Sequence, residues 1–143
     1  MAREIKFRGK VFNYGKDCGW VYGYYHCEYT GNFYSCISTI DPEKAETNLY
    51  SVEENTVGQF TGLRDKNGKE IYDGDIIHYT HHAGYLLDSF VGEVVWMDDY
   101  ACFGYSTMGY DYAFADIDEI DSDFLSHVEV IGNIYENPEL LTK

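Results

Sequence analysis

The chain has 143 residues, of which 45% are hydrophobic and 17% aromatic, so it can fold around a core and is not a disordered chain. It has no apolar run of the roughly 20 residues that a membrane helix needs and no hydrophobic run typical of a signal peptide, so we expect a cytoplasmic protein without a membrane partner. Lys and Arg total 10 against 25 Asp and Glu, and residues 70–142 hold 16 acidic side chains and no Lys or Arg, which excludes direct nucleic-acid binding through that half.

The chain begins with a predicted hairpin. Residues 4–10 alternate polar and apolar side chains, which is typical of a half-buried strand. Lys6, Arg8 and Lys10 fall on one face of this strand, and we expect that face to be solvated. The aromatic segment 20–26 predicts the second strand of the hairpin.

A second hairpin is predicted over residues 28–38, with its turn at Gly31. Beyond it, Asp41 has the side chain of a helix N-cap and Pro42 suits the first helical position. We therefore expect one or two helical turns that run to Leu49.

The central stretch, residues 56–79, is dense in turn residues. Asp65 can bond its own backbone, and Gly68 supplies the positive φ of a tight turn between two short strands. Asp73 and Gly74 predict a second turn, from which a new strand emerges. This pattern resembles the first strand of SH3-like barrels.

The remainder predicts a strand meander, an acidic segment, a last strand and a helical turn. The expected strands cover residues 92–97, 101–106, 112–115 and 127–135. The acidic segment covers residues 116–123, and the helical turn covers residues 137–141. The fold class is thus mainly β, a barrel-like assembly of antiparallel hairpins with one or two short helical turns. We expect a single domain over residues 1–143, with an N-terminal hairpin region (1–55) and a barrel-like region (56–143).

The acidic side chains of the second half form the main candidate interaction face. One interpretation is a solubilising surface, and the other is a face that meets a basic protein or mimics nucleic acid. The candidate residues are Asp98, Asp99, Asp111, Asp116, Asp118, Glu119, Asp121 and Asp123.

Three histidines, His78, His81 and His82, lie within five residues and have ligand types that suit zinc or nickel. Residues along one strand rarely converge on one ion, so we assign no metal and no cofactor, and the histidines stay candidates only. The alternative is a solvated polar loop. The acidic segment 116–123 lacks the glycine that a calcium loop of the EF-hand type requires.

The sequence predicts no catalytic residue. It has no phosphate loop and no dinucleotide fingerprint. Cys102 and His127 are a conceivable nucleophile and base, but that assignment needs geometry. The cysteines have no zinc-type spacing, and we expect them to be reduced and partly buried. We expect Trp20 and Trp96 to be core anchors.

Three blocks of sequence resemble the YopX family. The longest contains Asp65-Lys66-Asn67-Gly68 and Asp73-Gly74-Asp75-Ile76. The blocks cover residues 3–10 with 19–24, residues 56–76 and residues 128–141. The resemblance implies a small protein encoded by a phage or prophage and found in the cytoplasm of a bacterial host. It implies no enzymatic activity and supplies no catalytic residue.

Three functional hypotheses follow. The first is a non-catalytic accessory protein that acts through protein binding as a homo-oligomer, because sheet edges in a small β protein need covering. The second is an acidic mimic or inhibitor that captures a basic host or phage protein. The third is an enzyme of unknown reaction, which requires a cleft with convergent polar groups.

Overall fold

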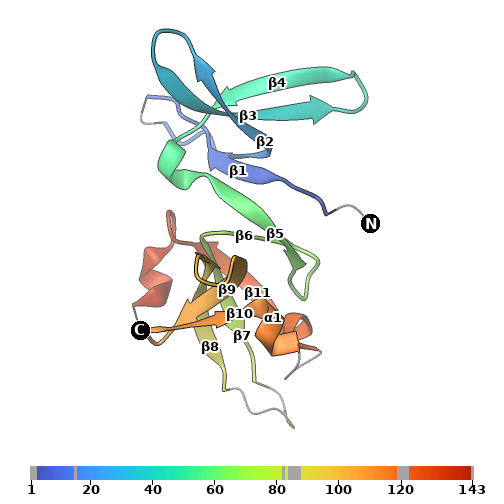
Figure 1. The fold of residues 1–143 in the computed structure, drawn as a ribbon, viewed down its shortest axis with the longest axis vertical. Coiled ribbons are helices and arrows are strands. Elements are labelled where there is room, and N and C mark those ends of the chain that lie inside the picture. Colours follow the sequence, from blue (N-terminus) through green and yellow to red (C-terminus); the bar gives the residue numbers. More distant parts are fainter. Residues whose placement is uncertain (1–2, 15, 82, 84–87, 119–122, 143) are drawn as a thin grey trace. The chain divides into compact units, whose positions relative to one another are not determined.

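The structure is a computed structural model that describes residues 3–14, 16–81, 83, 88–118 and 123–142, with the backbone alone at 117 and 118. The chain divides into an N-terminal unit, Met1–Phe60, and a C-terminal unit, Thr61–Lys143. Figure 1 labels their elements, which are mostly strands. No helix in the described part of the chain has the length and apolar character needed to cross a membrane.

The elements follow one another along the chain with short connections. They are β1 (Phe7–Lys10), β2 (Trp20–Tyr29), β3 (Phe33–Asp41), β4 (Glu46–Ser51), η1 (Glu54–Thr56), β5 (Gly58–Arg64), β6 (Glu70–Tyr72), β7 (Asp75–Tyr79), β8 (Phe90–Met97), β9 (Cys102–Thr107), β10 (Tyr110–Ala113), α1 (Phe114–Asp118), η2 (Phe124–His127), β11 (Val128–Asn133) and η3 (Pro138–Leu141). Hydrogen bonding orders one sheet β4-β3-β2-β1-β5-β6 and the other β10-β9-β8-β7-β11. The predicted mainly β, antiparallel fold is therefore confirmed.

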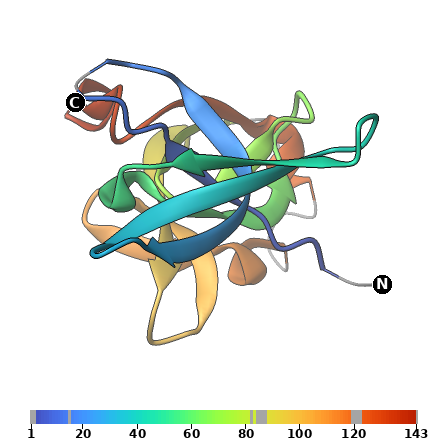
Figure 2. The same cartoon turned by 90° about the horizontal axis from the view of Figure 1, so that it is seen from above.

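The N-terminal unit is built from consecutive antiparallel hairpins. Strand β2 pairs with β1 at one end and with β3 at the other, and β3 pairs with β4. Figure 2 shows the long strand β3 running between β2 and β4. The hairpin predicted at Gly31 is confirmed, because β2 ends at Tyr29 and β3 begins at Phe33.

The helical turns predicted from Asp41 to Leu49 are wrong. Asp41 Oδ1 accepts hydrogen bonds from the backbone N–H groups of Glu43 and Lys44, at 2.9 and 3.3 Å. These bonds close a tight turn, and Glu46–Ser51 then forms β4. Aspartate favours such turns as strongly as helix caps, and the pairing with β3 decides between them.

The prediction that the face of the first strand with Lys6, Arg8 and Lys10 is solvated is also wrong in part. Arg8 is buried, with its guanidinium carbon 4.8 Å from the Trp20 ring centroid. Lys6 places its ammonium 5.3 Å from the Phe60 ring centroid. Basic side chains with long apolar stems can lie against aromatic rings, so this face is partly covered by the chain itself.

The central turn links two distant parts of the C-terminal unit. Asp65 Oδ1 accepts the backbone N–H groups of Asn67 and Lys69, each at 2.9 Å, while Oδ2 accepts the N–H of Val130 in β11, also at 2.9 Å. Gly68 has φ +78°, as the tight turn predicted here requires. The Asp65 carboxylate therefore fixes the turn and attaches it to the second sheet.

The second predicted turn is confirmed as well. Gly74 has φ +86°, and β7 begins at Asp75 directly after it. Asp75 is buried, and its Oδ2 accepts the N–H of Tyr72 at 2.8 Å. The carboxylate thus holds the chain on both sides of the turn.

The C-terminal sheet is the predicted meander, from β7 through β10, with β11 added beside β7. Among the described residues, no hydrogen-bonded pair joins β10 to β11, so no closed barrel is found and the SH3-like detail stays a prediction. Strand β10 ends at Ala113, and the predicted strand residues 114 and 115 belong to α1 instead.

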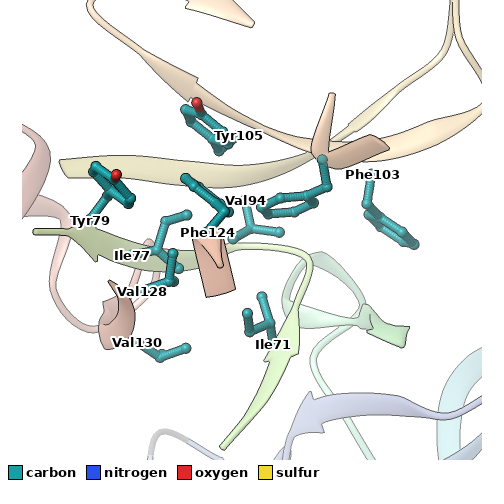
Figure 3. Close-up of a cluster of buried hydrophobic side chains, with 10 residues drawn as sticks. Ile71, Ile77, Tyr79, Val94, Phe103, Tyr105, Phe124, Val128 and Val130 are labelled. Atoms are coloured by element: carbon teal, nitrogen blue, oxygen red, sulfur yellow. The ribbon is translucent and has the colours of Figure 1, made fainter. Parts of the chain in front are cut away.

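The core of the C-terminal unit lies on one face of this meander. Figure 3 shows aliphatic and aromatic side chains converging from β6, β7, β8, β9 and β11, together with Phe124 of η2. The Phe124 ring stacks at 5.1 Å from the Tyr79 ring and 5.8 Å from the Tyr105 ring, measured between centroids. Phe124 therefore closes the core from outside the sheet.

Candidate functional site

The predicted acidic residues lie on several exposed elements of the C-terminal unit. Asp98 and Asp99 form the turn between β8 and β9, and both are exposed. Asp111 in β10, Asp116 in α1 and Asp123 before η2 are exposed too. The side chains of Asp118, Glu119 and Asp121 lie outside the described residues. The described carboxylates are therefore available to solvent.

Two carboxylates lie on one row across the outer face of the meander. Glu93 in β8 pairs with Ser106 in β9, which in turn pairs with Asp111 in β10. Burial raises the pKa of Glu93, and the charges of Asp73 and Asp111 raise it further. Glu93 therefore belongs with the acidic side chains of this unit, because it shares a row with Asp111.

Sequence reasoning did not include Glu93 and Asp73 in the acidic face. The strand alternation over residues 92–97 predicts that Glu93 and Val94 lie on opposite faces of the sheet, so the sequence indicates that Glu93 faces away from the core. Its neighbours across the sheet depend on strand register, which the sequence leaves open.

Exposed aromatic side chains accompany the carboxylates. Trp96 is 43% exposed and Tyr100 is 70% exposed, on either side of the Asp98-Asp99 turn. The prediction of Trp96 as a core anchor is therefore wrong. Its ring lies edge-on to the Phe103 ring, and the two centroids are 4.9 Å apart. Trp96 is near the end of β8, where the buried core ends. Trp20 is half-buried against Arg8.

The histidines occupy different environments. His78 lies in β7, half-buried, and is paired in register with Glu129 and Val91. His81 is exposed, and its backbone N–H donates to Ser89 Oγ at 2.7 Å. His82 lies outside the described residues. Within the described ranges, no group of three His, Cys, Asp or Glu side chains is arranged to hold a metal ion.

The Cys102 and His127 pair does not form. Cys102 begins β9 and pairs with Met97 at one end of β8, whereas His127 precedes β11 with its ring 6.4 Å from Tyr79. Tyr79 pairs with Phe90, at the other end of β8. Two strands also separate β9 from β11, which places them about 14 Å apart.

The cysteines are all free thiols. Cys36 is buried and Cys102 is half-buried, whereas Cys18 and Cys27 are exposed, so the prediction of partial burial holds for two of the four. Burial, followed by the charge of Glu28, raises the pKa of the Cys36 thiol. A raised pKa keeps that thiol protonated and unreactive.

The amino-acid sequence is similar to that of a known protein family. The family model described as YopX protein matches residues 6–142. The chain belongs to the YopX family. The crystal structure of protein EF1440 from Enterococcus faecalis resembles this YopX chain with a TM-score of 0.53 and 23% sequence identity, covering 98% of this chain and 99% of that one. That likeness concerns the fold alone. No curated protein matches the chain.

The Glu93→Gln variant is expected to be more stable than the wild type at about pH 7 and equally stable at about pH 4. The folded-state pKa of Glu93 lies above its ordinary value of 4.5, so the native state binds a proton more tightly than the unfolded state. The wild type therefore loses stability as the pH rises through the folded pKa, and glutamine removes this loss. The gain should be about 0.5 kcal/mol, because the carboxylate is partly solvated.

Urea denaturation of both proteins at the two pH values measures this difference. A gain of the same size at both values would contradict the electrostatic explanation, because improved packing alone does not depend on pH.

Proposed function

We propose that this YopX-family chain is a non-catalytic accessory protein of phage or prophage origin that acts in the bacterial cytoplasm by binding a basic protein. The observation that supports this most is the pair of exposed carboxylates Asp98 and Asp99 beside the exposed rings of Trp96 and Tyr100. We call these four side chains the acidic–aromatic turn. Aromatic side chains with neighbouring charges are the usual anchors of protein interfaces.

The charge of the C-terminal unit supports the same proposal. The sequence has no Lys or Arg between residues 70 and 142, so none in that range can neutralise the turn. A basic partner would be drawn to this surface over about one Debye length and then held by contact with the rings. An acidic mimic that occupies the nucleic-acid site of such a partner is a special case of this function.

A non-catalytic role agrees with the arrangement of the reactive side chains. Cys102 and His127 lie near opposite ends of β8. Nucleophilic catalysis requires a nucleophile and a base within hydrogen-bond reach. Cys102 and His127 do not meet this requirement.

The Asp98→Asn/Asp99→Asn double variant should bind a basic peptide at least about fivefold more weakly than the wild type. The probe is a peptide of alternating lysine and glycine, measured by fluorescence anisotropy between about 50 and about 300 mM salt. The loss reflects two removed charges at the place where the peptide contacts the rings.

The matched control is Glu4→Gln/Glu43→Gln, which removes the same charge from exposed positions of the N-terminal unit outside β4. It should keep the wild-type affinity. An equal loss in both double variants would show that only net charge matters, and it would contradict a defined binding surface.

A homo-oligomer is the second part of the proposal, and β4 favours it. All six residues of β4 are exposed, and within the described chain this strand pairs on one side only, with β3. It contains neither lysine nor proline, which are the residues that commonly protect sheet edges. Two copies could therefore join through antiparallel pairing of their β4 strands.

The oligomer is tested by light scattering on the wild type and on Leu49→Lys. We expect a dimeric mass for the wild type and a monomeric mass for the variant, because a lysine on an edge strand opposes pairing. A monomeric wild type at the highest soluble concentration would remove this part of the proposal.

A further inference from the structure

The N-terminal unit contains a hollow that differs in character from the acidic–aromatic turn. Its volume is about 620 Å³, within the range of pockets that hold small ligands. The side chains that give it its chemistry are four aromatic rings and two carboxylates. They are Phe12, Tyr14, Phe33, Tyr34, Glu53 and Glu54.

The rings are exposed to a degree that the fold itself does not require. Tyr14 is 91% exposed and Phe33 is 77% exposed. The Phe12 and Tyr14 rings lie against each other with centroids 5.7 Å apart. Exposed aromatic rings that gather around one hollow are typical of a surface that awaits a ligand.

The backbone at Tyr14 adds an independent sign of function. Tyr14 has φ +41°, in the left-handed region that bulky residues rarely adopt. Residues held in such conformations concentrate at ligand-binding and switch regions. The residue with this backbone conformation is also one of those that line the hollow.

The charge of the hollow selects the ligand. Glu53 and Glu54 supply two carboxylates, and no Lys, Arg or His is among the described residues that line it. Lys10 lies two residues before Phe12, and its Nζ forms an ion pair with Asp17 Oδ2 at 3.7 Å. Aromatic faces and carboxylates together suit a cation, because the rings attract it through their quadrupoles and the carboxylates pair with it.

Among protein cations, the arginine side chain fits this set best. Its planar guanidinium stacks on aromatic rings and offers a fork of N–H donors to carboxylates, whereas lysine presents a compact, strongly hydrated charge. We infer that the hollow formed by Phe12, Tyr14, Phe33, Tyr34, Glu53 and Glu54 is a binding site for an exposed arginine side chain of a protein partner. This site lies in the N-terminal unit and does not depend on the acidic–aromatic turn.

The test is a titration of the full-length, ¹⁵N-labelled protein with N-acetyl-argininamide, followed by amide chemical shifts. The uncharged matched probe is N-acetyl-citrullinamide, which has nearly the same shape. We expect saturable shifts around residues 12–14 and 53–55 with a millimolar Kd, and an affinity for the citrulline probe at least about tenfold lower.

Variants locate the site. Glu53→Gln/Glu54→Gln should weaken arginine binding at least about fivefold, and Tyr34→Leu at least about threefold. Glu4→Gln/Glu43→Gln removes the same charge elsewhere in the unit and should leave the Kd within about twofold. The one-dimensional spectrum of each variant confirms that it is folded.

Three results would overturn the proposal. They are shifts that do not saturate, equal affinity for the arginine and citrulline probes, and an equal loss in the two glutamate double variants. The Asp98→Asn/Asp99→Asn variant separates this site from the proposed function, because it should bind the arginine probe as the wild type does.

Discussion

Replacing Asp65 by alanine is expected to destabilise the C-terminal unit by about 3 kcal/mol, because three backbone N–H groups lose a charged acceptor. The carboxylate is buried and accepts these bonds from Asn67, Lys69 and Val130. Alanine removes this partner from the N–H of Val130, which is buried although β11 is an edge strand of its sheet. The loss should therefore affect both the turn and the attachment of β11.

Urea denaturation of Asp65→Ala in a Trp20→Phe background measures this change, since Trp96 then reports on the C-terminal unit alone. Asp65→Asn should lose less stability than Asp65→Ala, because asparagine keeps one acceptor oxygen. It should still be less stable than the wild type, because its NH₂ group faces a backbone N–H that needs an acceptor. The control Asp99→Ala removes an exposed carboxylate and should change stability by less than about 0.5 kcal/mol. Equal stabilities of Asp65→Ala and Asp99→Ala would contradict the structural role of Asp65.

Replacing Phe124 by alanine is expected to cost about 3–5 kcal/mol, the range for removing a large aromatic ring from a packed core. The ring is 1% exposed and stacks on Tyr79 and Tyr105. Because Phe124 covers the core from η2, its loss opens one side of the unit to water. Phe124→Leu should cost distinctly less, since leucine fills part of the volume.

The same tryptophan-based denaturation measures the effect. Tyr110→Ala removes an aromatic ring of similar size that is 68% exposed and should be nearly neutral. If Phe124→Ala unfolds at the same urea concentration as Tyr110→Ala, then η2 does not close the core.

Turn chemistry made the central part of this fold predictable. Asp65, Gly68 and Gly74 each perform the backbone role that their residue types indicate. Such signals are local, because a glycine with positive φ or an aspartate that bonds its own turn needs no distant partner. The meander after Gly74 followed from strand alternation for the same reason.

The wrong predictions concern residues whose state is decided by distant neighbours. Asp41 can cap a helix or close a turn, and pairing of β4 with β3 selects the turn. Arg8 is buried because Trp20, twelve positions later, lies beside it. Phe124 carries no local pattern, and its role as a core residue appears only when η2 is placed on the meander.

The candidate site was predictable in composition and less so in geometry. The acidic bias after residue 70 is plain in the sequence and includes Asp98 and Asp99, which are exposed in the structure. Strand register was needed to bring Glu93 and Asp111 onto one row, and the end of the core at β8 was needed to expose Trp96. The aromatic hollow of the N-terminal unit joins segments about 20 residues apart, which no sequence period connects.

Site-specific photocrosslinking tests the proposed binding surface most directly. A photoreactive phenylalanine analogue is placed at Tyr100, beside the Asp98-Asp99 turn, or at Tyr24, which is also exposed but lies in the N-terminal unit and does not line the aromatic hollow. In bacterial lysate, we predict that the Tyr100 position captures a basic protein that the Tyr24 position does not, and that Asp98→Asn/Asp99→Asn or added salt abolishes the capture. Capture of the same proteins at both positions, or of partners without basic character, would contradict the account.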